Sequence, residues 1–240
     1  MNIFVGTSGW QYDWNPDGFD WYLRYSKLNA IELNSSFYRF PFKNQVKSWK
    51  RKTEQLNPNL RWSIKVNRFI THIFKFSEKS YKTWEKFKGL FTPLEEFIDF
   101  YLFQIPQFLK PKKTLENLKK FVKFCNLKER FAFEVRSLEW YDKKILEEIK
   151  ALEITFVSVD APEFTKLPRE IYSFNKIVYL RMHGRTYWYF HNYSEIELKE
   201  VCDKILKSKA KKIYIFFNNN HNMLENARKC YQMLKNYLRE

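Results

Sequence analysis

Stretches in which bulky apolar residues alternate with small or polar ones recur along the chain, and helix-like segments separate them. The stretch Phe131–Tyr141 shows this pattern most clearly. In its first half, FAFEVR, the two Phe and the Val point one way, and the Ala, Glu and Arg point the other, as in a β-strand. A helix-like segment with Ile145, Leu146 and Ile149 follows it directly. The pattern therefore predicts a strand, a polar tip and a helix.

The same pattern recurs eight times. The predicted strands are Ile3–Gly9, Ala30–Ser36, Arg61–Asn67, Phe100–Pro106, the first half of Phe131–Tyr141, Ile154–Asp160, Ile177–Gly184 and Lys212–Asn218. Segments with apolar residues at helical spacing connect most of them. One such segment opens with a capping box, Ser194 to Glu197. The segment Ala161–Asn175 holds two prolines, so we expect a loop there with a short turn of helix.

Eight strand–helix units in 240 residues favour a single (β/α)8 TIM-type barrel domain of the α/β class over residues 1–240. The main rival is a doubly wound open sheet, whose strands are apolar on both faces. Here one face of most strands is bulky, as if to meet helices, and the other is small or polar, as if to fill a narrow interior. The sequence also lacks GxGxxG and GxxxxGK[ST], the phosphate-binding signatures of open sheets.

The chain is strongly basic, with 43 Lys and Arg against 27 Asp and Glu and a net charge of +16. This charge indicates either attraction to nucleic acid or a lysine-rich composition whose lysines only solvate helix exteriors. The three cysteines are far apart and form no CxxC pair, which is typical of reduced thiols in a cytoplasmic protein. No signal-peptide pattern and no apolar run near 18 residues is present, so we expect no membrane association.

Polar residues gather at the carboxyl ends of the predicted strands, where barrel enzymes carry their active sites. We interpret four of them as catalytic candidates: Glu32, Glu134, Asp160 and His183. The candidate ligand-binding residues are Asn34, Lys65, His72, Gln104, Arg136, Arg181 and Asn218, and Ser8 lies beside them. An anionic ligand suits the two arginines, which bind phosphate or carboxylate bidentately. Glu134 and His183 would then exchange protons with the ligand.

Charges within this set balance, because three carboxylates face one lysine and two arginines, and we expect them to pair. This balance argues against a metal site, although one ion held by Glu134, His183 and a third carboxylate remains an alternative. The pattern assigns no cofactor and no oligomeric state. Aromatic residues near the strand ends either stack on a ligand ring or simply cover the barrel mouth: Trp10, Tyr12, Phe37, Tyr38, Trp140, Tyr141, Tyr187 and Trp188. Of these, Tyr38 and Trp140 join the candidate ligand-binding residues.

A family resemblance rests on short motifs that run in order through nearly the whole chain. They are GTSGW at 6–10, IELNSSFYRFP at 31–41, KVNRFITH at 65–72, FQIP at 103–106, FEVRSLEWY at 133–141, RMHG at 181–184 with YS at 193–194, and FFNNN at 216–220. With these motifs the chain resembles the YecE-like domain of unknown function (domain of unknown function 72). The segment after Asp160 is shorter than the family pattern, and Asn67 stands where a small or apolar residue is common.

The resemblance implies a TIM-type barrel but no established activity. It also implies a similarity to endonuclease IV-type barrels, and hence DNA binding or repair, as a fold-level analogy. This chain has only four histidines, fewer than the metal set of such a nuclease suggests. Three hypotheses follow: an enzyme acting on a phosphate- or nucleotide-like anion, a nucleic-acid-binding protein, and a metal-dependent hydrolase or isomerase.

Overall fold

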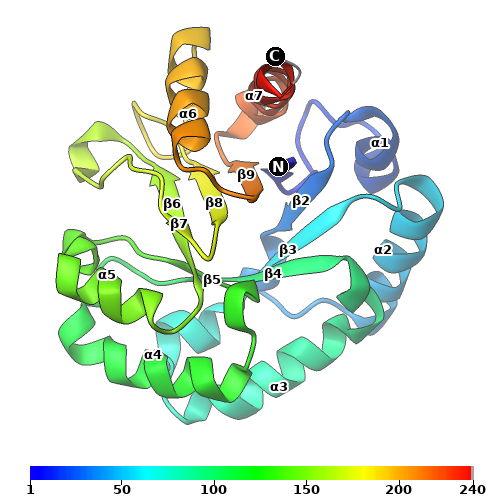
Figure 1. Cartoon of the computed structure of the whole chain (residues 1–240). Helices are drawn as coiled ribbons and strands as arrows, with labels where there is room; N and C mark the ends of the chain where they lie inside the picture. The colour runs from blue at the N-terminus through cyan, green and yellow to red at the C-terminus, as the bar shows by residue number, and fades with distance from the viewer. Residues whose placement is uncertain (239–240) are drawn as a thin grey trace.

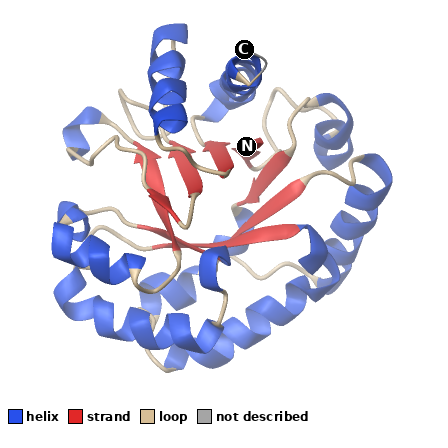
Figure 2. Cartoon of the chain, in the orientation of Figure 1, coloured by secondary structure: helices blue, strands red, loops and turns tan. Residues whose placement is uncertain are grey.

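The computed structural model describes residues 1–238 and shows a closed barrel of eight parallel strands ringed by helices (Figures 1 and 2). The barrel strands are β1 (Asn2–Ser8), β2 (Ala30–Leu33), β3 (Arg61–Lys65), β4 (Ile98–Gln104), β5 (Phe131–Glu134), β6 (Thr155–Asp160), β8 (Ile177–Met182) and β9 (Lys212–Phe217). Each strand pairs with the next in sequence, β6 pairs with β8, and β9 closes the ring onto β1. The predicted (β/α)8 fold is confirmed.

Helices follow seven of the eight barrel strands and form the outer layer. They are α1 (Gly18–Tyr25), α2 (Lys43–Leu56), α3 (Lys79–Phe91), α4 (Pro111–Cys125), α5 (Lys143–Lys150), α6 (Glu195–Lys207) and α7 (Met223–Tyr237). After β6 the chain makes only a short 3₁₀ turn, Glu163–Thr165, as its two prolines predict. It then adds β7 (Ser173–Phe174), an unforeseen short strand antiparallel to β8. The capping box of Ser194 and Glu197 opens α6 as expected.

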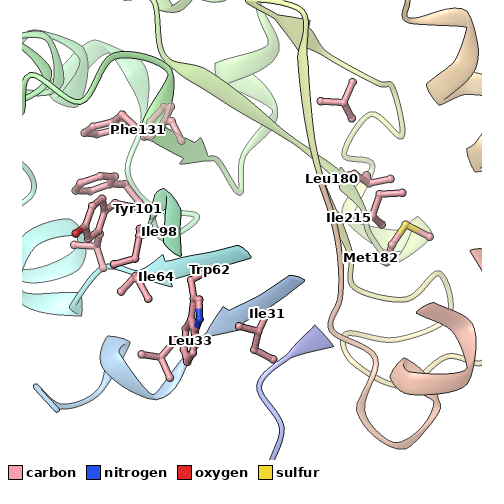
Figure 3. Close-up of a cluster of buried hydrophobic side chains, with 14 of the residues drawn as sticks. Ile31, Leu33, Trp62, Ile64, Ile98, Tyr101, Phe131, Leu180, Met182 and Ile215 are labelled. Carbon is pink, nitrogen blue, oxygen red and sulfur yellow. The ribbon is translucent and has the colours of Figure 1, made fainter. Parts of the chain in front are cut away.

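The outward faces of the strands form the main core beneath the helices. Figure 3 shows this layer, to which Trp62 and Ile64 contribute from β3 and Leu180 and Met182 from β8. The layer is rich in rings, as the composition predicts; the Phe103 and Phe131 rings stack with centroids 3.8 Å apart. Burying a large apolar side chain of this kind stabilises the fold by about 1.5–3 kcal/mol.

The inward faces fill the barrel with a second, smaller core. Its members include Phe100, Leu102, Val157, Tyr179 and Phe216. The interior is narrow, since a Cβ built on Gly6 of β1 would lie 2.2 Å from the carbonyl oxygen of Ala30 on β2. At the amino-terminal end of the strands, Tyr214 of this inner core donates through its hydroxyl to Asp99, which also pairs with Arg61.

Strand register also corrects one expectation from the sequence. Val157 and Val159 of β6 lie beside Tyr179 and Arg181 of β8, on the inward face. Asp160 pairs in register with Met182, a member of the outer core, and so points out of the barrel. The prediction that Asp160 joins the inner polar set is therefore wrong. Within residues 1–238, no helix is long and apolar enough to span a membrane.

Candidate active site

Arg181 lies at the centre of the polar set inside the carboxyl end of the barrel. Its Nε and Nη2 donate to the two oxygens of Glu32 at 3.0 and 2.6 Å, and its Nη1 donates to Glu134 Oε2 at 2.7 Å. None of the three side chains is exposed to solvent. One guanidinium thus joins two carboxylates from opposite parts of the ring, and the pairing of charges predicted from the sequence is confirmed for this trio.

The carboxylate of Glu32 is fully occupied by neighbours. Besides Arg181, Ser8 Oγ donates to it at 2.7 Å, Asn34 Nδ2 at 3.1 Å and the hydroxyl of Tyr179 at 2.7 Å. The sequence analysis did not select Tyr179, yet it stands two residues before Arg181 and so on the same strand face. Because every lone pair of Glu32 has a donor, this carboxylate orders the site and is poorly placed to take a proton from a ligand.

Glu134 is held as a carboxylate by three neighbours. Arg136 Nη2 lies 2.6 Å from Glu134 Oε1, and His183 Nε2 lies 3.2 Å from the same oxygen. Burial would raise the pKa of Glu134, but the charges of Arg136 and Arg181 outweigh it and hold the pKa well below its usual range. Glu134 therefore remains ionised and its oxygens remain engaged, which does not suit a group that must accept and release protons near neutral pH.

His183 is a neutral member of this network. Burial, followed by the charges of Arg136 and Arg181, keeps its pKa well below the usual value. Asn218 Nδ2 lies 3.2 Å from its Nδ1, while its Nε2 lies 3.2 Å from Glu134 Oε1 and 3.1 Å from Arg136 Nη2, so the tautomer decides whether Nε2 donates to Glu134 or accepts from Arg136. His183 and Asn218 thus lie where the sequence predicts, but both ring nitrogens already have partners.

Arg136 is the member of the network that reaches open space. Its Nε is buried and has no hydrogen-bond partner among the described residues, and its guanidinium lies 4.2 Å from the ring centroid of Trp188. It borders a cavity of about 450 Å³ whose other walls include Gln104, Gln107, Thr165 and Trp188. The residues after β4 and β6 that line this cavity escaped the sequence analysis, because loop positions carry no periodic signal.

Lys65 stands alone among the inner charges. Its ammonium lies 4.5 Å from the ring centroid of Phe37. Burial lowers its pKa to about 7, and the positive charges of Arg181 and Arg136 act in the same direction against the weaker pull of Glu134 and Glu32. Within residues 1–238 it has no carboxylate at ion-pair distance; the carboxylates nearby are engaged by the arginines. The prediction that all inner charges pair fails at this residue.

Two other candidates lie beside this group. His72 belongs to a π-helical turn, Phe69–Ile73, and its ring packs edge-on against Phe37 with centroids 5.0 Å apart. Burial and then the charge of Lys65 lower its pKa to about 4, so it is neutral near pH 7. Gln104 donates to the carbonyl of Ile105 at 2.7 Å while it lines the larger cavity. On the other side of the mouth, Ser8 and Asn34 line a second cavity of about 250 Å³.

Asp160 and two of the aromatic candidates have other positions. Asp160 accepts from Arg185 Nη2 and from the Tyr193 hydroxyl, both at 2.9 Å, outside the barrel wall. Trp140 is fully buried, donates through Nε1 to the carbonyl of Leu109 at 2.8 Å and packs on Phe133, so the expectation that it contacts a ligand is wrong. Trp10 packs in the core and also lines the cavity of about 250 Å³. Tyr38, by contrast, is 70% exposed at the rim.

Within the described residues, 1–238, potential metal ligands form no cluster that could hold an ion. Among residues 1–238, no three His, Cys, Asp or Glu side chains are placed to hold an ion together. The third carboxylate that the alternative site with Glu134 and His183 requires is therefore not found in the described part of the chain.

Comparisons with known proteins agree with the fold. A family model described as "Protein of unknown function DUF72" matches residues 4–240. Among solved structures, a DUF72 family protein from Thermotoga maritima is 24% identical over the whole of both chains, with a TM-score of 0.78. Another from Enterococcus faecalis is 24% identical over 98% of both chains, with a TM-score of 0.80.

A more distant structure shares only the architecture. It is a D-psicose 3-epimerase from Clostridium cellulolyticum, which is 9% identical over 99% of both chains with a TM-score of 0.61. At such identity the likeness concerns the fold alone. No curated protein matches the sequence.

Proposed function

This chain belongs to the DUF72 family of proteins of unknown function, and we propose that it is an enzyme acting on a small phosphate- or nucleotide-like anion at the carboxyl-terminal mouth of its barrel. One observation carries the proposal: the buried, unpartnered Nε of Arg136 beside a cavity of about 450 Å³. A buried donor without an acceptor costs about 1–3 kcal/mol, and an oxyanion in the cavity would satisfy it. Gln104 and Gln107 supply further amide donors on the cavity wall.

The charge of the inner set supports the same ligand class. Glu32 and Glu134 offset Arg136 and Arg181, so the ammonium of Lys65 is the uncompensated charge. An anion near it would lower the cost of keeping Lys65 protonated. A site in which a guanidinium and an ammonium face a partly enclosed space binds phosphate and carboxylate groups in many enzymes.

Calorimetric titration with inorganic phosphate and a set of sugar phosphates tests this proposal. We expect saturable binding to the wild-type protein and at least about tenfold weaker binding to Arg136→Gln, which removes the charge and leaves a shorter, neutral hydrogen-bonding side chain. Arg51→Gln is the matched control, because Arg51 is exposed on α2 and distant in sequence from every candidate. Equal affinity in the Arg136 and Arg51 variants would overturn the proposal.

Proton uptake gives a second, independent measurement. An anion bound next to Lys65 raises the pKa of this residue from about 7, so binding at pH 7.5 should take up part of a proton. Titrations in buffers of different ionisation enthalpy measure that uptake directly. We expect it to disappear in Lys65→Met, and uptake that persists unchanged in this variant would show that another group is responsible.

A specific observation also favours the second candidate function, nucleic-acid binding. Large apolar side chains exposed at the surface gather in the loops after the strands: Tyr38, Phe42, Phe69, Phe108, Phe164, Tyr187 and Phe190. Exposed rings of this kind stack on unpaired bases, and the net charge of +16 would attract the backbone.

Fluorescence titration with a short single strand at increasing salt distinguishes the two candidates. For nucleic-acid binding we expect affinity to fall steeply with salt and to weaken in Phe42→Ala, whose ring is 77% exposed. Ile196→Ala, an exposed apolar residue on α6, is the control. Failure of any strand to bind near physiological salt would remove this second candidate and leave the small-anion proposal untouched.

A further inference from the structure

We propose that Lys65 is a nucleophile that forms an imine with the carbonyl group of a small anionic substrate whose charged group Arg136 binds. The inference rests on the proposed anion site and adds a substrate class to it: a carbonyl compound that carries a carboxylate or a phosphate. Lys65 stands at the end of β3, on the inward face of the barrel, with its amine at the mouth.

The surroundings of the Lys65 amine differ from those of a structural lysine. A structural lysine inside a barrel pairs with a carboxylate, whereas both inner carboxylates here are engaged by Arg136 and Arg181. The aromatic face of Phe37 packs against the amine, and this side chain has no oxygen or nitrogen that could accept a hydrogen bond. The residue is partly exposed where β3 ends, and we place the ligand's approach to the amine on this side.

These surroundings also favour the reactive form of the amine. Only the neutral amine attacks a carbonyl, and lysines become nucleophilic when they are desolvated or placed beside another cation. Lys65 meets both conditions, because burial lowers its pKa to about 7 and Arg181 and Arg136 oppose its charge. Near neutral pH a large fraction of this amine is therefore unprotonated, while exposed lysines titrate near 10.4.

The proposed step balances without a cofactor. The lone pair of Lys65 Nζ forms a bond to the carbonyl carbon, and the carbonyl oxygen takes up a proton to give a carbinolamine. The carbon–oxygen bond then breaks, water leaves, and the nitrogen keeps a double bond to carbon. Nothing is oxidised or reduced. Both hydrogens of the neutral amine end on the departing oxygen, the first as the carbinolamine forms and the second as water leaves. We assign their transfer to neutral His72, which packs on the same Phe37 ring.

Arg136 accounts for the preference for an anionic carbonyl compound. Arg136, Gln104 and Gln107 border the cavity of about 450 Å³, which has room for a compound of a few carbon atoms, and Nε of Arg136 is a donor without a partner. Lys65 is not among the residues that line this cavity, but it is close enough to Arg136 for the two charges to repel, so a compound whose carboxylate or phosphate is held by Arg136 would extend its carbonyl from the cavity toward Lys65. Arg181 cannot take this role, since its Nε, Nη1 and Nη2 already donate to Glu32 and Glu134.

Borohydride trapping tests the inference. The protein is incubated at pH 7 with a low concentration of pyruvate or glyoxylate, reduced with borohydride and digested, and the modified lysines are located by mass spectrometry. We expect one reduced adduct, on Lys65, to form at least about tenfold faster than adducts on exposed Lys113. Lys65→Arg should abolish this adduct, whereas Lys113→Arg should leave it unchanged.

The pH dependence of trapping and a neutral probe separate this inference from the anion proposal. The trapping rate at Lys65 should reach half of its maximum near pH 7, and Arg136→Gln should slow trapping of pyruvate more than trapping of acetone. If Lys65 is trapped as fast with acetone as with pyruvate, the result would support Lys65 as the nucleophile but overturn the proposed anion site. Saturable phosphate binding with no faster trapping at Lys65 than at Lys113 would overturn the nucleophile and leave the anion site standing.

Discussion

Arg181 donates two hydrogen bonds to Glu32 from a position 149 residues later in the chain, and no part of either side chain is exposed. The same guanidinium reaches Glu134, so three buried charges stabilise one another where solvent cannot. Such a network is expensive to disrupt, because removing one member leaves the others charged, desolvated and unpaired.

Arg181→Met should therefore destabilise the protein severely. The change leaves Glu32 and Glu134 buried without their shared cation, and we expect the free energy of unfolding to fall by about 3–5 kcal/mol. Urea unfolding followed by circular dichroism measures this loss. Arg51→Met on the exposed face of α2 is the control and should change stability by less than about 0.5 kcal/mol. A similar, small loss in both variants would contradict the central role of Arg181.

Lys65 gives the protein a specific pH dependence of stability. Its folded pKa of about 7 lies below the unfolded value of roughly 10.4, so between these values the unfolded state binds more protons. The free energy of unfolding should then rise as the pH increases from 7 to about 10, by up to about 1.4 kcal/mol per pH unit, and fall again as the pH is lowered to 7. The measurement is the free energy of unfolding of wild type minus that of Lys65→Met between pH 7 and 10. A constant difference would contradict the lowered pKa.

Asp160→Asn should destabilise the protein by weakening contacts on the outer side of the barrel strands. Asp160 is nearly buried and pairs with Arg185 and Tyr193, which anchor the segment after β8. We expect the free energy of unfolding to fall by about 1–3 kcal/mol, because Arg185 and the Tyr193 hydroxyl both lose a charged, nearly buried acceptor, while Arg185 keeps its contact with Glu200. Glu200→Gln is the matched control: it removes only the partly exposed contact of Arg185 and should cost less than about 1 kcal/mol. Chemical denaturation of the two variants compares these losses.

Two glycines should respond in opposite ways to the same substitution. Gly6→Ala places a methyl group 2.2 Å from the carbonyl oxygen of Ala30, so strands β1 and β2 must move apart and stability should fall by about 3 kcal/mol or more. Gly89→Ala, on the exposed side of α3 with no atom within 4 Å, should raise stability by about 0.5–1 kcal/mol. Thermal unfolding of both variants gives the two signs, and a loss of stability in Gly89→Ala would contradict the second.

The period of two along each strand made much of the site predictable. Glu32, Lys65, Glu134, Arg181 and His183 all lie on the strand faces that alternate with the outward core residues, although these inner faces also carry bulky residues such as Tyr179 and Phe216. This inference works because the side chains of a strand alternate whatever the strand packs against. It failed for β6, where the inward residues are valines and the polar residue, Asp160, points outward. Alternation separates two faces, but only the neighbouring strands decide which of them is the interior.

The loops were less predictable, for a related reason. Trp140 follows the end of a strand, and for this reason the sequence predicts that it lies at the mouth of the barrel. In the structure it belongs to the 3₁₀ turn Leu138–Tyr141, and its indole is buried in the core. Apart from Gln104 and Arg136, the walls of the larger cavity come from loop residues after β4, β6 and β8, which no periodic pattern connects. A loop position acquires its neighbours from tertiary packing alone, so its role is not readable from local sequence.

The sequence by itself determined the eight-unit barrel and most of the residues at its mouth, because hydrophobic periodicity and strand order are local properties of the chain. Only the tertiary structure decided which of those charges neutralise one another. Glu32, Glu134 and Arg181 lie far apart in the chain, and closure of the ring brings them within hydrogen-bond distance. That pairing consumes both inner carboxylates and leaves Lys65 without a counter-charge. The property that distinguishes Lys65 thus arises from contacts made by other residues.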